Sequence, residues 1–319
     1  MTSNDVDTAH AAPATHLTNA RVYAGNEAFN IYNKLKPDGP VLDLVESILS
    51  ISYDIYIGPR GRIFLRDSFT ELRNTLRNGQ PSLVDFAAER RRVFTSMGLR
   101  KTTSYKEASL RRTVEIIGSH RFRGKVVDIG ANDNSLGRLL VAQCPLVAEV
   151  LGVDIERRTE ATDPPGVSFL LQQQPEILPI GDGAYDMAII RYALHHMTFH
   201  VQETLLSEVR RILKPSGHLV IIEDTFSEQF VPFCSNVLLD KFLHLPKDQR
   251  LLTLACLDAS SCLIEDERMP FAFTFRSLEE WQLAASNAGF EVVRAVFWGL
   301  PFFSLYQAPL GLFTFQSRP

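Results

Sequence analysis

Cysteine is scarce in this chain, with four residues in 319, at positions 144, 234, 256 and 262, and no Cys-x-x-Cys spacing. This pattern predicts incidental thiols in a reducing, cytoplasmic environment and indicates neither disulfide bonds nor a metal site. Long apolar runs are also lacking, since none reaches the roughly 18 residues of a membrane span. The N-terminus has no basic segment followed by an apolar one, so neither a signal peptide nor a membrane partner is expected.

An excess of charge of one sign is lacking too. The 33 Lys and Arg residues and the 37 Asp and Glu residues leave a net charge of −4. This balance gives no general attraction for nucleic acid, so we expect a small-molecule substrate and no nucleic-acid partner. The hydrophobic share of 45% is that of an ordinary globular protein. A monomer and a homodimer both fit these observations.

The first 122 residues show no alternation of strands and helices. Residues 1–18 are small and polar, which predicts a disordered tail. Residues 19–122 are interpreted as a mainly helical N-terminal region or lid, with helices near residues 41–49, 83–97 and 105–117. Within this region, Ile51–Phe64 is predicted to form two short extended pieces around a Gly-Pro-Arg-Gly turn.

From Lys125 onward, short apolar strand patterns alternate with helical ones. The segments KVVDIG, VLGVDI, DMAIIR and HLVIIED have the apolar character of strands that are buried on both faces. Helices are predicted at Leu136–Ala142 and after Thr198, whose hydroxyl suits an N-cap. The short connections favour a doubly wound, mostly parallel α/β sheet over residues 123–319.

This alternation pauses between residues 225 and 275. The segment is rich in aromatic residues, has a helical stretch near residues 237–245, and is interpreted as a cap insertion over a binding site. The alternation then resumes with a helix from Ser277 to Ala288 and with strands at Glu291–Phe297 and Leu310–Gln316.

Candidate ligand-binding residues follow the predicted parallel strands. The first strand runs into DIGANDNSLG, which begins at Asp128; the second ends at Asp154, and the third ends at Arg191 and Tyr192. In open parallel sheets, ligands bind beyond the carboxyl ends of the strands. The sequence therefore predicts one ligand site shared by these three strand ends.

Four segments together resemble the class I S-adenosylmethionine (SAM) dependent methyltransferases. VVDIGANDNSLG resembles their first motif, an acid followed by a glycine-rich loop, and GVDIE resembles their second-strand acid. LPIGDGAYDMAIIRYALHHM and RRILKPSGHLVIIED are similar to the segments around their fourth and fifth strands. The downstream SLEEWQLAASNAGFEVV is typical of the small-molecule branch. The resemblance implies a seven-stranded Rossmann-like fold that binds SAM.

The resemblance also implies roles for the residues at the strand ends. Asp128 would hold the amino group of the methionine part of SAM, directly or through water. Gly130 lets the backbone approach the cofactor closely. Asp154 would accept hydrogen bonds from the ribose hydroxyls, and Ile155 directly after it is a further expected cofactor contact.

Residues after the fourth strand border the reacting end of the cofactor in this family. Arg191 and Tyr192 would lie beside the methionine moiety and the sulfonium, and Tyr105 would either approach the methionine carboxylate or lie on the surface. The pair His195 and His196 suits either a general base or a structural role. His196 and Tyr192 are the candidate catalytic residues.

The sequence departs from the family pattern at two places. The second and third glycines of the family's loop fall on Asn132 and Asn134, which we still count as cofactor-binding because asparagine tolerates left-handed backbone. The acid that normally contacts adenine is replaced by a glutamine run, in which Gln173 and Gln174 are the candidate contacts. Which glutamine contacts adenine stays open.

Methyl transfer by in-line displacement to a small, secondary-metabolite acceptor is the activity that the resemblance implies. Alignment of the acceptor and exclusion of water supply much of the acceleration, so a dedicated base is not always needed. The alternatives are aminocarboxypropyl transfer, cyclisation of SAM with release of methylthioadenosine, and a non-catalytic binding module. A nicotinamide dehydrogenase is disfavoured because no Gly-x-Gly-x-x-Gly follows the first strand.

Overall fold

Strands rich in branched apolar residues form the centre of the protein. The computed structural model describes residues 39–78, 83–99, 103–156, 162–262, 272–302 and 307–318. The strands are β1 (Gly124–Ile129), β2 (Val147–Asp154), β3 (Val167–Leu171), β4 (Tyr185–Arg191), β5 (Leu213–Asp224), β6 (Phe290–Gly299) and β7 (Leu310–Ser317). Among the described residues these seven form one sheet in the order β3-β2-β1-β4-β5-β7-β6. Only β7 runs antiparallel to its neighbours, so the predicted doubly wound, mostly parallel sheet is confirmed.

Alternate side chains of the central strands pack on opposite faces of this sheet. Val126 and Val127 of β1 are both fully buried, each in a different apolar cluster. One face is covered by α6 (Thr103–Ile117) and α7 (Ser135–Gln143). The other is covered by α8 (Phe199–Ile212) and α11 (Leu278–Asn287). Burying a valine or leucine side chain contributes about 1.5–3 kcal/mol, so this two-sided burial fixes the position of the strand ends.

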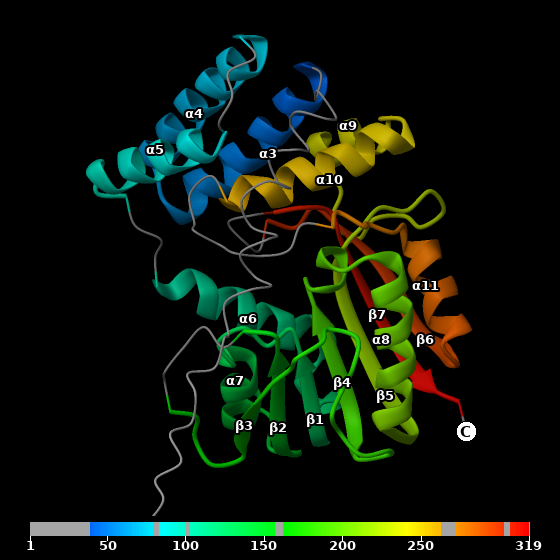
Figure 1. Ribbon diagram of the computed structural model, residues 1–319. Helices are drawn as coiled ribbons and strands as arrows, with labels where there is room; N and C mark the ends of the chain where they lie inside the picture. Colours follow the sequence, from blue (N-terminus) through cyan, green and yellow to red (C-terminus); the bar gives the residue numbers. More distant parts are fainter. Residues whose placement is uncertain are drawn as a thin grey trace, which may run out of the picture.

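A layer of helices lies beyond the carboxyl ends of the parallel strands (Figure 1). This helical layer consists of α3 (Gly39–Tyr56), α4 (Pro59–Asn78), α5 (Leu83–Ser96), α9 (Val237–Leu243) and α10 (Lys247–Cys262). Helices α3 and α10 pack against each other although about two hundred residues separate them in the sequence. Buried residues of both helices, including Ile48 and Leu254, belong to the same apolar cluster as one face of the sheet.

One prediction for the N-terminal region is wrong. Ile51–Phe64 does not form extended pieces: α3 continues to Tyr56 and α4 begins at Pro59. Gly58 has a φ of 93°, which is the left-handed conformation that commonly ends a helix, and a proline is favoured at the first position of the next one. The turn was therefore located correctly, but it joins two helices.

Most of the other elements agree with the sequence. Thr198 caps α8 by accepting a hydrogen bond from the backbone N–H of Val201, and Ser277 caps α11 in a capping box with Glu280. Strand β3 and helix α10 were not predicted. The predicted tail at residues 1–18 lies outside the described residues, and the division of the chain into domains stays a prediction. Within the described ranges, no helix combines the length and apolar character needed to cross a membrane.

Candidate cofactor and acceptor site

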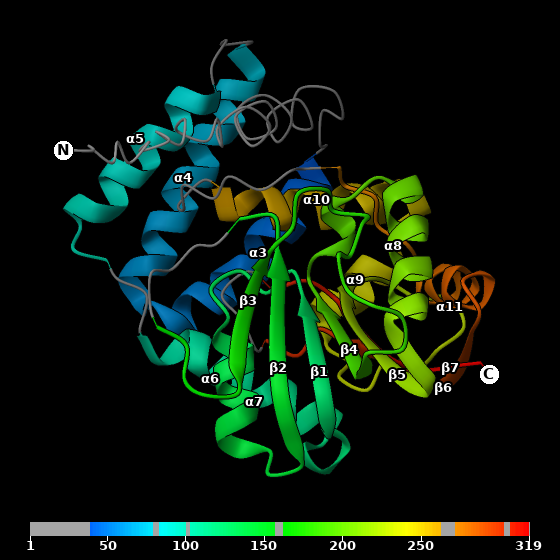
Figure 2. The ribbon, with the colours of Figure 1, turned by 60° about the horizontal axis from the view of Figure 1, so that its bottom comes forward.

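The predicted site residues meet at one end of the sheet, which we call the carboxyl edge: the carboxyl ends of β2, β1, β4 and β5. Asp128 lies opposite Gly152 of β2 and Ile189 of β4. Asp154 is the last residue of β2, and Arg191 is the last residue of β4. Figure 2 shows β1, β2 and β3 running toward the helical layer. The parallel order of the strands thus brings the three side chains to the same edge, as the sequence predicts.

The loop after β1 has left-handed backbone at Gly130, Asn132 and Asn134. Gly130 has a φ of 77°, and a Cβ atom added there would stand 2.7 Å from the Cβ of Ala193. Asn132 and Asn134 have φ values of 55° and 63°. The expectation that these two asparagines adopt the left-handed backbone in place of glycine is confirmed, although their contact with a cofactor stays a prediction.

The side chain of Asn134 points into the protein. It is fully buried, and its amide donates hydrogen bonds to Asp163 Oδ2 at 2.9 Å and to the Ser168 carbonyl of β3 at 3.0 Å. The space for it exists because position 152 is a glycine, where a Cβ would stand 2.3 Å from the Asn134 Oδ1. Asn134 therefore fastens the loop to the sheet, and any contact that it makes with a cofactor comes from its backbone.

Asp154 organises the same loop from the end of β2. Its Oδ2 accepts a hydrogen bond of 2.7 Å from the backbone N–H of Asn132, and its Oδ1 accepts one of 3.3 Å from Glu156 N–H. A carboxylate oxygen can accept more than one hydrogen bond, so these two bonds are compatible with binding of ribose hydroxyls. The neighbouring Ile155 is 44% exposed, which leaves an apolar side chain beside this acid for a base to lie against.

The glutamine run divides into one structural and two exposed residues. Gln172 is buried, and its amide donates to the carbonyls of Pro175 and Ile177 at 2.9 and 2.8 Å. Gln173 and Gln174 are exposed. Gln172 is thus occupied in holding its own loop, and the two exposed glutamines stay the candidates for adenine.

Asp128 is a strongly perturbed acid at the carboxyl edge. Only 3% of it is exposed. Burial raises its pKa from 3.8 to about 7, helped by the negative charges of Asp154 and Asp133 and opposed by the positive charge of Arg191. A carboxylate in this position pays a desolvation cost that a cationic ligand would offset. This is the environment expected for an acid that receives an ammonium group.

Arg191 and Tyr192 lie on the α6 side of the sheet. The guanidinium carbon of Arg191 is 5.5 Å from the centre of the Tyr192 ring, a cation–π distance. Tyr192 has a φ of 52° and faces a small cleft together with Thr113 of α6 and Trp298 of β6. Tyr105 belongs to α6, but its side chain lies outside the described residues. These candidates stay predictions.

The histidine pair lies on the opposite, α8 side and belongs to a buried polar cluster. His195 and His196 form the end of a 3-10 turn, η2 (Leu194–His196), directly after β4. His195 Nδ1 is 2.5 Å from Glu223 Oε2, and the other Glu223 oxygen accepts the backbone N–H groups of Ala193 and Leu194 at 2.8 and 2.7 Å. The two catalytic candidates Tyr192 and His196 are therefore in different clusters.

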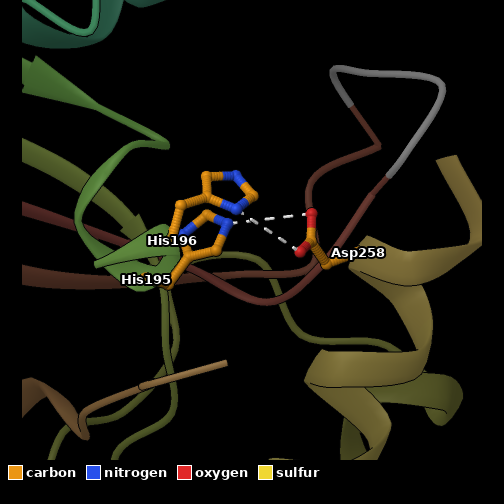
Figure 3. Close-up of side chains that lie close together, drawn as sticks. All are labelled: His195, His196 and Asp258. Carbon is orange, nitrogen blue, oxygen red and sulfur yellow. Dashed lines mark ion pairs between the residues drawn. The ribbon is translucent and has the colours of Figure 1, made fainter. Parts of the chain in front are cut away.

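Asp258 of α10 completes this cluster from the inserted segment. Its carboxylate oxygens are 3.7 Å from His195 Nε2 and 3.9 Å from His196 Nδ1, and Figure 3 shows both imidazole rings directed at it. Burial lowers the pKa of His195, but the Glu223 and Asp258 carboxylates outweigh it and raise the pKa well above its ordinary value. Burial also raises the pKa of Asp224, at the end of β5, to about 7. The carboxyl edge thus carries a concentration of buried carboxylates beneath α10.

Glu223 and Asp258 are functional candidates that the sequence did not identify. Glu223 is the last residue but one of a predicted strand, so the rule that located Asp128 and Asp154 applies to it as well. Asp258 gives no such signal, because it lies in a helix that was not predicted and meets the histidines only through the fold.

Comparison with known proteins addresses the central sheet. Residues 127–221 match the family model described as a methyltransferase domain. The match runs from β1 to β5, through the loop and the strand ends that hold Asp128, Asp154 and Arg191, in a sheet of the order given above. The chain carries a class I SAM-dependent methyltransferase domain.

This methyltransferase domain has recognisable relatives. The uncharacterized methyltransferase YcgJ of Bacillus subtilis is 33% identical over 132 residues, which are 38% of this chain and 49% of the relative. The ubiquinone/menaquinone biosynthesis C-methyltransferase UbiE of Paraburkholderia phytofirmans is 29% identical over 114 residues, 34% of this chain and 45% of the relative. The crystal structure of YcgJ has a TM-score of 0.44 and 19% identity over 67% of this chain and 99% of that one. The chain spans about half the length of the curated relatives that it matches.

SAM is the cofactor of such domains, and the residues at the carboxyl edge fit it. The buried Asp128 carboxylate suits the ammonium group of the methionine part. Asp154 stands at the end of the neighbouring strand, where a carboxylate suits ribose hydroxyls, and Gly130 keeps side-chain atoms out of the loop between them.

Proposed function

We propose that this protein transfers a methyl group from SAM to a small-molecule acceptor held between the carboxyl edge and the helical layer. The observation that carries the proposal is the buried Asp128 beside the Gly130 loop, with Asp154 on the next strand, within a domain of the methyltransferase family. Bound SAM supplies an electrophilic methyl carbon. The chain's own task is to hold the cofactor, to align the acceptor with that carbon and to exclude water.

The cofactor residues divide this task among the strand ends. Asp128 receives the ammonium group, Asp154 receives the ribose hydroxyls, and Ile155 with Gln173 or Gln174 borders the base. Asn132 contributes through the loop that Asp154 anchors by a 2.7 Å hydrogen bond. Arg191 keeps a positive charge near the methionine carboxylate. The two backbone hydrogen bonds that Asp154 accepts support these roles, because they fix the loop and the acid relative to each other at the place proposed for the ribose.

We infer that partly buried aromatic residues, where the helical layer meets the sheet, line the acceptor side. Tyr56 at the end of α3 donates a hydrogen bond of 2.8 Å to the carbonyl of Phe302. Phe273 and Phe302 pack partly buried against the same apolar cluster. Such a lining favours a partly apolar acceptor of small-molecule size.

Substitution of the ribose acid tests the cofactor site. Asp154→Ala removes charge-assisted acceptors for two hydroxyls, each worth about 1.5–3 kcal/mol, so we expect SAM affinity to fall on the order of 100-fold in calorimetry. Asp67→Ala, at an exposed acid of α4, is the matched control and leaves affinity unchanged. A folded Asp154→Ala protein with the affinity of the wild type would overturn the assignment of this site.

Product analysis tests the reaction separately from binding. With SAM and candidate apolar metabolites, methyl transfer yields S-adenosylhomocysteine and a methylated acceptor in equal amounts. If methylthioadenosine is the sole nucleoside product, the reaction is aminocarboxypropyl transfer or cyclisation instead of methyl transfer. The assignment of the cofactor site would be unaffected by that result. Absence of SAM binding in the wild type would leave a non-catalytic module.

A further inference from the structure

The side chains of His195, His196 and Asp258 form a set of metal-ligand type. One donor atom from each lies within 4.8 Å of the others. The histidines come from η2 after β4, and Asp258 comes from α10 of the inserted segment, so the fold brings together two distant parts of the chain (Figure 3). His195 and His196 are 2% and 9% exposed. The three side chains therefore face one another in a largely water-excluded position.

The spacing of the donor atoms suits a shared ion better than direct hydrogen bonds between them. His195 Nε2 is 3.7 Å from Asp258 Oδ1, and His196 Nδ1 is 3.9 Å from Asp258 Oδ2. Hydrogen bonds of this type are about 2.7–3.2 Å long. Ligand atoms of a tetrahedral ion with bonds of about 2.1 Å stand roughly 3.4 Å apart. A small side-chain movement would bring the three donors onto one ion.

An outer carboxylate orients the first of these ligands. Glu223 is fully buried and its Oε2 lies 2.5 Å from His195 Nδ1. Its other oxygen is fixed by the backbone N–H groups of Ala193 and Leu194. In the neutral tautomer with the proton on Nδ1, which is the form that binds a metal ion, the lone pair of His195 Nε2 faces Asp258. Histidines that bind metals almost always donate their other ring N–H to a carboxylate, a carbonyl or water, which is the arrangement of Glu223 and His195.

We propose that His195, His196 and Asp258 bind one divalent transition-metal ion, with Glu223 as the outer-shell partner of His195. Two imidazoles and one carboxylate suit zinc, iron, cobalt or nickel, whereas calcium and magnesium prefer oxygen ligands throughout. Three protein ligands leave at least one coordination position open. The ion would join α10 to the carboxyl edge. As a ligand of the ion, His196 could not also act as the catalytic base considered from the sequence. The proposal is independent of the proposed methyl transfer, since the ion is measured without SAM.

Cobalt titration of the full chain tests this site directly. The protein, without a purification tag, is freed of metal by a chelator and titrated with Co²⁺. We expect one equivalent to give ligand-field absorption in the visible range, and added Zn²⁺ to displace it and to raise the melting temperature. A metal-free chain that shows neither the absorption nor the rise in melting temperature would overturn the proposal without any variant.

Variants then assign the ligands. Asp258→Asn and His195→Ala are expected to abolish the Co²⁺ spectrum, and Glu223→Gln to weaken binding about 10- to 100-fold as outer-shell changes do. The matched controls His200→Asn on α8 and Asp248→Asn on α10 change exposed residues of the same types and leave the spectrum intact. Circular dichroism and SAM binding report whether each variant folds. A spectrum that survives in folded Asp258→Asn, or that is lost in either control, would place the ion elsewhere and refute this site.

Discussion

Substituting Asp128 by asparagine should make the protein more stable and a poorer binder of SAM. The carboxyl group is nearly fully buried, and its pKa is raised from 3.8 to about 7. Between these two values the folded state holds a proton that the unfolded state has released, so stability falls as the pH rises from about 4 to about 7. The gap of about 3 pH units corresponds to about 4 kcal/mol at 1.36 kcal/mol per unit.

Asparagine cannot ionise, so Asp128→Asn escapes this destabilisation above neutral pH. The pKa gap already includes the attraction of Arg191. The buried amide of the variant must still satisfy its own N–H donors, so we expect about half of the 4 kcal/mol, or about 2 kcal/mol. For a domain of this size, that is a rise in melting temperature of about 4–8 °C. Thermal unfolding at about pH 8 measures it, with Asp67→Ala as the control. At about pH 4 the difference should vanish, because the wild-type carboxyl is then protonated as well.

Cofactor binding should change in the opposite direction. An ammonium group binds the ionised form of Asp128, so the affinity of the wild type for SAM should fall about eightfold from about pH 7.5 to about pH 6. Asp128→Asn should bind more weakly at pH 7.5 and lose this pH dependence. Calorimetry at the two pH values checks both. Equal affinity of variant and wild type would refute the reasoning, as would a variant less stable than the wild type.

Further substitutions separate loop geometry from cofactor contact. Gly130→Ala places a side chain at a φ of 77° and 2.7 Å from the nearest atom, so it should lower stability and SAM binding by about 1–3 kcal/mol. Gly183→Ala has a positive φ but open space around the new side chain, so it should show the effect of backbone strain alone. Equal effects of the two variants in urea unfolding and calorimetry would contradict the steric contribution at Gly130. Asn134→Ala should lower stability by about 2–3 kcal/mol through two lost buried hydrogen bonds, and unchanged urea unfolding would show that the buried amide is not needed. Gln173→Ala should weaken SAM binding several-fold and leave the melting temperature unchanged. Gln172→Ala should mainly lower the melting temperature, because it removes the hydrogen bonds that hold its own loop. The reverse pattern would show that the two glutamines have exchanged roles.

Much of the sheet was predictable because its strands are apolar on both faces. β4 carries four buried residues in succession, which only a central parallel strand requires. β3 escaped prediction because it is five residues long and lies at the end of the sheet, where only Val167 is buried. Helix α10 escaped for the opposite reason. Its residues from Thr253 to Leu257 are all buried, so the spacing that marks a one-sided helix is absent.

The cofactor side of the site was predictable from local rules. Acids that follow parallel strands must meet at the carboxyl edge, and this placed Asp128 and Asp154 correctly at one end of the sheet. The direction of each side chain was not predictable. Asn134 turns inward only because a glycine at position 152 leaves room, and Gln172 turns inward to bind its own loop. Both depend on neighbours that are distant in sequence.

The proposed acceptor side lies in parts of the chain that the family match does not reach. The methyltransferase match ends at residue 221, whereas Glu223, Asp258 and the helical layer lie outside it. Asp258 approaches the histidine pair only because α10 packs on α3, so the N-terminal helices and the inserted segment together set the chemistry above the carboxyl edge. Relatives that share the central sheet alone therefore give no guide to the acceptor. When residues 225–275 are exchanged between two such proteins, we expect each chimera to methylate the acceptor of the protein that supplied this segment. The SAM affinity of each chimera should equal that of the protein that supplied the sheet.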